Sequence, residues 1–210
     1  TAVQLHTDLP FNEGSGTLAA DSSGNGHTGT LTNGATWATG HSGTAVSLNG
    51  SGAYVALPPN LLTDVSDCTL SAWVFWNASQ TWARIFDFGS GTGHYLMLTP
   101  RNSAGVARFA ITVNGHGDQI IDGTAALPIG QWVHVAVTLS GSTGALYVNG
   151  AAVATNTAMF LAPFRLGGTT QNWLGKSQYA ADPGFNGLID DFRIHRGALS
   201  GAQIVSLMNS

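Results

Sequence analysis

An acidic strand near the end of the chain is the first place where residue types suggest chemistry. Within residues 185–196, Leu188, Asp190, Phe192 and Ile194 occupy alternate positions, so a strand would turn all four toward one face. A carboxylate that faces the core needs a partner, because an unpaired buried charge is too costly to keep. The chain has only 7 Lys and Arg residues to supply one. A bound metal ion is therefore a serious candidate.

A polar loop at residues 21–27, Asp-Ser-Ser-Gly-Asn-Gly-His, offers the oxygen ligands that calcium prefers. Asp21 and Asn25 carry side-chain oxygens, while Gly24 and Gly26 let the backbone turn sharply and expose its carbonyl groups. Taken alone, the loop is better explained as a turn in which Asp21 bonds its own backbone. Together with Asp190 it favours a calcium site that joins the first loop to the last strand.

Catalytic arrangements find little support in the sequence. Glu13 is the only glutamate, so the Glu-x-Asp-x-x-Glu spacing of β-sandwich glucanases cannot occur. Asp87, Asp118 and Asp122 could pair only if the fold brings them together. The chain has no Gly-x-Ser-x-Gly motif, and its 7 histidines lack His-x-His or His-x-x-x-His spacing. The single cysteine, Cys68, precedes an apolar run and is interpreted as a small buried hydrophobe.

Aromatic and polar residues beside predicted turns suggest sugar binding instead. An aromatic ring covers the C–H face of a sugar, while amides and guanidinium groups bond its hydroxyls. The residues of this kind are Trp76, Trp82, Arg84, Tyr95, Arg101, Gln171, Asn172, Trp173 and Tyr179. Trp76 and Trp132 lie in apolar runs and are expected in the core. Trp173 ends a polar run and is expected at the surface.

The elements that must position these residues are predicted to be short strands. Apolar segments recur between Gly-rich turns, which is typical of an all-β sandwich. The pattern predicts a hairpin of 45–48 with 53–57 and a further short strand at 164–167. One helix is expected near the end, where Ser200 and Gln203 form a capping box. Residues 1–210 are predicted to form one domain.

The composition of the chain limits the classes of partner that it is expected to bind. Charged residues make up 9% of the chain, against about 25% in an average domain, and the net charge of -4 includes no basic cluster. Nucleic acid is therefore an unfavoured partner. No apolar run approaches the ~20 residues of a membrane span. Low charge and a single cysteine fit an exported bacterial protein, and a start at Thr1 without Met suggests processing or trimming.

Four segments resemble the laminin-G-like, concanavalin A-like jelly-roll domains, in the order that this family has. They are residues 21–29, 132–138, 146–150 and 187–200. The resemblance implies a two-sheet antiparallel jelly roll with a short C-terminal helix, and a structural calcium ion between the first loop and the last strand. The ligands that it implies are Asp21, Asn25, the His27 carbonyl, Thr44 and Asp190.

Residues 83–100 resemble a bacterial subgroup of these domains, commonly appended to secreted glycoside hydrolases that include arabinose-releasing enzymes. The resemblance implies a non-catalytic, extracellular carbohydrate-binding module that keeps a catalytic domain of the same chain on plant or microbial polysaccharides. The predicted sugar contacts are Arg84, Tyr95, Arg108, Gln119, Asn172 and Trp173.

Two other functions remain open at this point. One is a polysaccharide-active enzyme of the same fold, either a glycosidase or a lyase that uses Arg84, His94, Tyr95 and Gln119. The other is a structural or protein-adhesion domain without glycan affinity. Activity and binding on a panel of polymers would separate the three.

Overall fold

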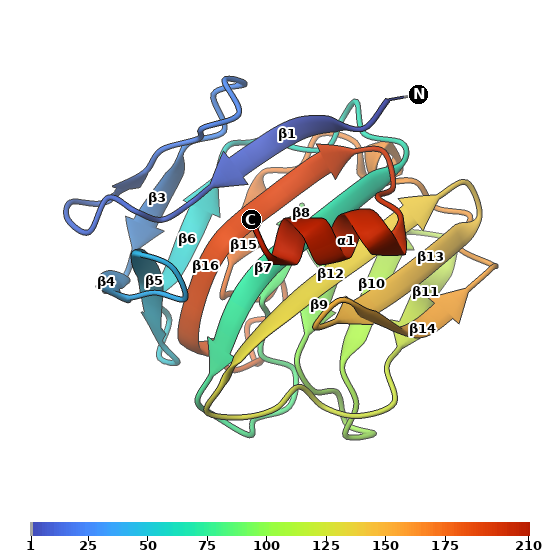
Figure 1. Ribbon diagram of the computed structural model, residues 1–210. Coiled ribbons are helices and arrows are strands. Elements are labelled where there is room, and N and C mark those ends of the chain that lie inside the picture. The colour runs from blue at the N-terminus through green and yellow to red at the C-terminus, as the bar shows by residue number, and fades with distance from the viewer. Residues whose placement is uncertain (1) are drawn as a thin grey trace.

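Strands with alternating apolar residues build two antiparallel sheets that face each other (Figure 1). The computed structural model describes residues 2–210. The first sheet has the order β14 (Ala151–Asn156), β13 (Thr143–Val148), β12 (Trp132–Ser140), β7 (Cys68–Trp76), β16 (Asn186–Arg196), β5 (Thr44–Asn49) and β4 (Thr36–Thr39), and β1 (Gln4–Leu9) also pairs with β16. The second sheet has the order β11 (Gly117–Asp122), β10 (Arg108–Val113), β9 (His94–Thr99), β8 (Phe86–Gly89), β15 (Gln171–Leu174), β6 (Tyr54–Leu57), β3 (Gly29–Thr32) and β2 (Leu18–Ala19). The all-β sandwich prediction is confirmed.

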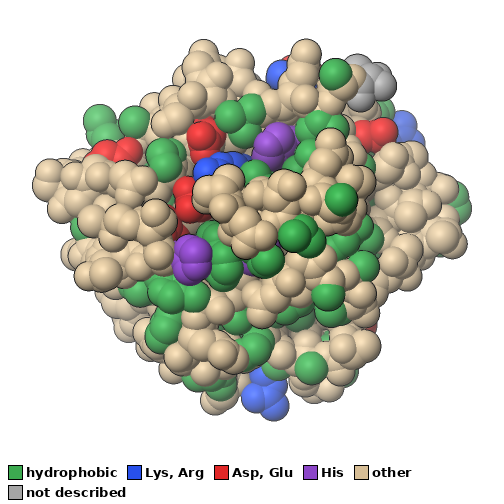
Figure 2. Space-filling model, in the orientation of Figure 1, with side chains coloured by type: hydrophobic (Ala, Val, Ile, Leu, Met, Phe, Trp, Pro, Cys, Tyr) green, Lys and Arg blue, Asp and Glu red, His purple; other side chains and the backbone are tan. Residues whose placement is uncertain are grey.

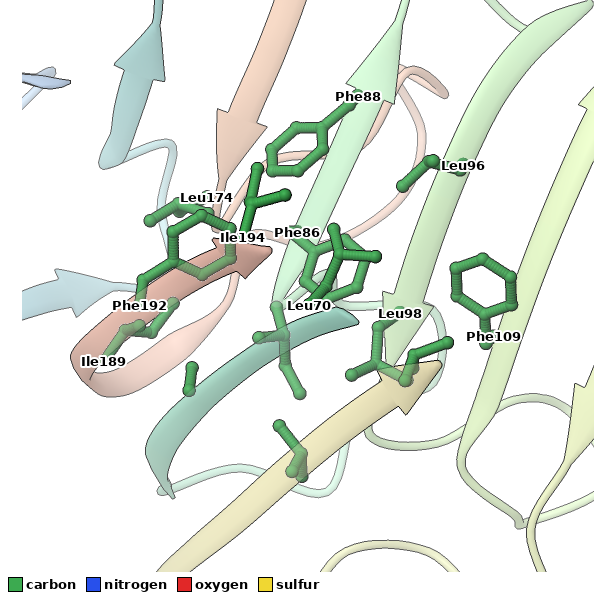
Figure 3. Close-up of a cluster of buried hydrophobic side chains, with 14 of the residues drawn as sticks. Leu70, Phe86, Phe88, Leu96, Leu98, Phe109, Leu174, Ile189, Phe192 and Ile194 are labelled. Carbon is green, nitrogen blue, oxygen red and sulfur yellow. The ribbon is translucent and has the colours of Figure 1, made fainter. Parts of the chain in front are cut away.

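The core fills the space between the two sheets with one face of each (Figure 3). On β9, Leu96 and Leu98 point inward, and on β10 Phe109 and Ile111 do so. Because side chains alternate along a strand, the residues between them point away from the core. The outer face of the second sheet therefore presents every other residue of β8, β9 and β10.

Strand β16 changes parity at Asp190, which corrects the prediction made for it. The pairing with β7 skips at this point, and Asp191 has a φ of 47°, as expected for a β-bulge. Ile189, rather than Leu188, lies in the core before the bulge, and Phe192 follows it there. Asp190 therefore points to the outer side of the first sheet. It is nevertheless fully buried, because the turn at residues 40–43 covers it.

Two local predictions were wrong because tertiary pairing overrode the local pattern. Strands β5 and β6 lie in different sheets, so the glycine-rich segment 49–52 carries the chain across the sandwich and closes no hairpin. Residues Pro163–Leu166 form the 3-10 helix η1, while the strand in this region is β15, which begins at Gln171.

Helix α1 (Gly201–Met208) closes the chain on the outer face of the first sheet, where it buries Ile204 (Figure 1). The predicted capping box is present. Ser200 accepts the Gln203 backbone N–H, and the Gln203 side chain accepts the Ser200 N–H. Cys68 is buried, and burial raises the pKa of its thiol to about 12, as the structural interpretation requires.

Candidate functional site

A cavity of about 240 Å³ lies on the outer face of the second sheet. Its floor comes from β9 and β10, and its walls come from β11 and from the loops before β8 and after β15. The residues that line it are Trp82, Arg84, Tyr95, Met97, Arg108, Ala110, Asp118, Tyr179 and Asp182. The positive charges of two guanidinium groups balance the negative charges of two carboxylates in this lining, which suits a neutral ligand.

Strand register sets the floor of the cavity. Met97 on β9 lies directly opposite Ala110 on β10, and both point away from the core. Tyr95 and Trp82 pack with them in a separate small apolar cluster. The floor is therefore apolar, while hydrogen-bonding groups stand around it.

Arg84 is the buried cation at the cavity wall, with only 2% of its surface exposed. Its Nε donates to Asp87 Oδ2 at 3.1 Å, one terminal nitrogen donates to the Trp82 carbonyl at 2.6 Å, and the other lies 2.9 Å from Asp182 Oδ2. These contacts use three of the five N–H groups of the guanidinium. Two donors remain for a ligand at the wall.

Asp87 lies beneath Arg84 on β8 and is completely buried. Burial raises the pKa of its carboxyl to about 7, and the attraction to Arg84 offsets only part of this rise. Its Oδ2 also accepts the Gln178 backbone N–H at 3.1 Å, whereas Oδ1 has no hydrogen-bond partner within residues 2–210. Asp87 positions Arg84 and does not itself line the cavity.

Two guanidinium groups lie near the Trp82 ring. The central carbons of Arg84 and Arg108 are 5.7 and 5.8 Å from its ring centroid. Its φ of 69° is unusual for a bulky side chain and is maintained by a hydrogen bond from its N–H to the Arg101 carbonyl at 2.8 Å. Arg108 is fixed by a bidentate pair with Asp122 at 2.6 and 2.7 Å. The strained backbone at Trp82 therefore places the indole at the cavity and not in the core.

Two tyrosines complete the wall. The rings of Tyr95 and Tyr179 meet edge to face with centroids 5.9 Å apart. Burial and then the neighbouring Tyr179 raise the pKa of Tyr95 above its ordinary value. Its hydroxyl therefore stays protonated as both donor and acceptor.

The structure brings together three of the six predicted sugar contacts, Arg84, Tyr95 and Arg108. Trp173 is on the same outer face but lies outside this cavity, against Tyr54 and Lys176. The other two predictions need correction.

Asn172 alternates with Trp173 on β15 and so faces the sandwich interior, where it is buried and donates to the Pro58 carbonyl at 2.8 Å. Gln119 pairs with the inward-facing Ile111, and its side chain accepts the Leu161 N–H at 2.8 Å. Neither is available to a ligand in the cavity.

Sequence reasoning missed Met97, Asp182 and the position of Trp82 within the site. Trp82 and Tyr179 carried a signal, because both are aromatic residues beside turns. Asp182 carried none, because only the folded loop brings it 98 positions back along the chain to Arg84. Nothing in the sequence distinguishes Met97 from an ordinary apolar residue of a strand.

The predicted calcium ligands fall into two groups. The Asp21 carboxylate accepts the backbone N–H groups of Asp8, Ser23 and His27 and the Ser23 hydroxyl, all at 2.8–3.0 Å. Burial alone would raise the pKa of Asp21, but these bonds hold it below its usual range. They also use about four lone-pair positions, so Asp21 offers no free oxygen in this arrangement. Asn25 donates an amide N–H to the His6 carbonyl at 3.0 Å, which leaves its side-chain oxygen unused by this bond.

Asp190 and Thr44 fit a cation better. The Asp190 carboxyl accepts backbone N–H groups of Ser42 and Asp191, and within residues 2–210 it forms no ion pair. Burial, reinforced by Asp191, raises its pKa to about 6. The Thr44 carbonyl lies beside the same turn at Gly40. Among the described residues, no three His, Cys, Asp or Glu side chains gather into a metal-binding group, so calcium stays a prediction that would rely on backbone oxygens.

Comparison with solved structures gives several close matches. Domain 4 of AbnA, a GH43 extracellular arabinanase from Geobacillus stearothermophilus, solved with arabinotriose, superposes with a TM-score of 0.82 at 27% identity, covering 99% of both chains. The binding domain of Paraclostridial Mosquitocidal Protein 1 matches with a TM-score of 0.74 at 16% identity over 98% of this chain and 52% of that one. The CBM40 of the Ruminococcus gnavus IT-sialidase, bound to α2,3 sialyllactose, matches with a TM-score of 0.68 at 17% identity over 78% and 95%.

These structures are binding or accessory domains, and this chain has their architecture. A search of curated proteins gives no match. Within residues 2–210, the only helices are too short to reach across a bilayer. The sequence model of one family, described as the concanavalin A-like lectin/glucanases superfamily, matches residues 49–205. The chain therefore belongs to the concanavalin A-like lectin/glucanase superfamily.

Proposed function

We propose that this domain is a non-catalytic carbohydrate-binding module of a secreted bacterial enzyme that degrades polysaccharides. The observation that carries the proposal is the cavity lined by Trp82, an aromatic ring near the guanidinium groups of Arg84 and Arg108 and beside an apolar floor. A ring face and the floor contact the C–H groups of a sugar, and the guanidinium and tyrosine groups bond its hydroxyls. The module would hold a catalytic domain of the same protein on its substrate.

Arabinose-containing glycans are the proposed ligands. The support is the likeness over almost the whole chain to an arabinanase domain solved with arabinotriose. The balanced charge of the lining also favours a neutral sugar. The extracellular setting of that arabinanase supports a secreted location for this protein.

A glycan panel tests the proposal. Arabinan, arabinogalactan, xylan and β-glucan are compared by affinity electrophoresis and calorimetry, with product analysis of each mixture. We expect arabinan to bind without turnover and Trp82→Ala to weaken binding about tenfold, equivalent to about 1.4 kcal/mol. Absence of binding to every glycan would contradict the proposal and favour a structural or protein-adhesion role.

Catalysis is the second candidate, because Asp118 and Asp182 both line the cavity. Asp182 is already engaged by Arg84 and by the Ser177 hydroxyl at 2.7 Å, which makes it a poor proton donor for glycoside cleavage. Product release that disappears in Asp118→Asn would establish an enzyme.

We propose further that a calcium ion binds the Asp190 carboxylate and the Thr44 backbone as a structural cofactor. The support is a buried carboxyl beside the carbonyl of Thr44, with no ion pair within residues 2–210. Binding at Asp21 would require its present hydrogen bonds to rearrange. The hydrogen bonds of Asn25 and His27 use their nitrogen atoms and not the oxygens proposed as ligands.

A further inference from the structure

A second hollow, of about 170 Å³, adjoins the cavity on the outer face of the second sheet. It lies along the loop that follows β15, and Asn33 and Gly52 form its far side. Tyr179 and Asp182 line both spaces, so the two are separated by one shared wall.

Strand register gives the distance from the cavity floor to Trp173, the ring on which the Lys176 ammonium rests. Met97 on the cavity floor pairs with Asp87 on β8, and Asp87 pairs with Trp173 on β15. Two steps between neighbouring strands of about 4.8 Å place Met97 and Trp173 roughly 10 Å apart. This span exceeds one sugar ring, so a ligand that touches both must contain more than one unit.

Among the residues that line the second hollow, Lys176 is the cation. Its ammonium lies 4.3 Å from the ring centroid of Trp173 and 4.5 Å from that of Tyr54. The two aromatic faces hold the charge in place by cation–π attraction. In the part of the chain that the structure describes, no carboxylate lies within ion-pair distance of Lys176. An ammonium has three donors and no acceptor, so its N–H groups remain available to hydroxyl oxygens.

We infer that the hollow at Lys176 is a second sugar subsite that binds a further unit of the same glycan chain held at Trp82. The inference rests on the proposed function and adds a direction to it: the glycan crosses β9, β8 and β15 over the shared wall. The Lys176 ammonium donates to hydroxyls of the second unit. Affinity should therefore rise with chain length until both spaces are filled.

Chain-length dependence is the first test. Arabinose, arabinotriose and arabinohexaose are titrated into the whole protein by calorimetry. We expect affinity to rise at least tenfold along the series. Lys176→Met, which keeps the aliphatic stem, should lower affinity for arabinohexaose about fivefold and leave that for arabinose unchanged. Arg165→Met removes an exposed cation from η1 and should change neither.

The second test follows the chemical acetylation of Lys176 in the wild-type protein, which is possible because Lys176 is the only lysine in the sequence. Acetylation of its amine is followed by peptide mass mapping. Arabinohexaose should slow the reaction several-fold, whereas arabinose should not, and Trp82→Ala should abolish the protection.

The outcomes separate the two ideas. If all three sugars bind with equal affinity and none protects Lys176, the second subsite is overturned while the binding module stands. If neither these three sugars nor any glycan of the panel binds the unmodified protein, the proposed function is contradicted, and the inference is contradicted with it.

Discussion

The outer faces of the two sheets both carry aromatic clusters, but the clusters are built differently. On the first sheet, the His41 ring stacks on Trp73 with centroids 3.6 Å apart, and Trp132 meets Phe75 edge to face at 5.6 Å. Figure 2, which views this face, has apolar side chains lying next to histidine and charged groups. On the second sheet, Trp82 lies near two guanidinium groups and borders a cavity.

Aromatic residues alone therefore do not make a binding site. Rings that stack on one another, as Trp73 and His41 do, cover the faces with which they would contact a ligand. The second face remains open because Arg84, with its two aspartates, fixes the loops around a space that no side chain fills. The predictions below test whether function belongs to that face alone.

The largest effect is expected from Arg84→Met. The change leaves Asp87 and Asp182 without their shared cation, and breaking a buried pair in this way costs about 3–5 kcal/mol. Denaturant unfolding above the raised pKa of Asp87, at about pH 8, measures this loss, and sugar binding should also be lost. The matched control is Arg108→Met, whose partner Asp122 is near the surface, and there we expect about 1 kcal/mol or less. Equal losses in both variants would contradict the special role of Arg84.

The two faces should respond to pH in opposite directions. Asp87 has a folded pKa raised to about 7, so the folded state retains a proton that the unfolded chain releases near pH 4. Relative to Asp87→Asn, the wild type should lose stability as pH rises from about 4 through 7, by on the order of 3 kcal/mol.

Burial, with repulsion from Arg193, lowers the pKa of His134 on the first sheet to about 4. Below about pH 6.5 the unfolded chain binds a proton at His134, whereas the folded state binds it only near pH 4. Relative to His134→Gln, the wild type should therefore gain stability as pH rises from about 4 to 6.5. Thermal unfolding at several pH values measures both differences, and slopes of the same sign would refute this assignment.

Calcium should act on the first sheet only. If calcium binds at Asp190, a concentration a hundredfold above its Kd stabilises the fold by about 2.7 kcal/mol, and a chelator removes this gain. Asp190→Asn should abolish the response, whereas Asp118→Asn, in the cavity of the second sheet, should keep it. A melting curve that rises equally in both variants would exclude Asp190 as a ligand.

The smallest effect concerns binding after loss of an aromatic ring from the first sheet. Trp132→Ala should reduce stability by roughly 1–2 kcal/mol, because its edge contacts with Phe75 and His41 disappear. Its affinity for sugars should change less than twofold. Calorimetry beside Trp82→Ala makes the comparison, and a tenfold loss in Trp132→Ala would move the binding face to the first sheet.

Local pattern predicted part of the site and missed the rest for identifiable reasons. Arg84, Tyr95 and Arg108 were proposed from residue type, and the cavity brings them together. Asn172 and Gln119 have equally suitable chemistry but point inward, because the start of β15 and the pairing of β11 set their parity. Trp132 was expected in the core, yet it is half-buried on the outer face of the first sheet.

Period-two alternation, Gly-rich turns and the Ser200–Gln203 pair are local signals, so the all-β class, most strand positions and the capped helix follow from them alone. Three features come from packing between distant segments: the sheet that each strand enters, the β16 bulge that turns Asp190 outward, and the loops that enclose the cavity. These features depend on contacts between residues far apart in the chain, such as Arg84 with Asp182. No local pattern encodes such contacts, because their energy exists only after the two sheets have packed.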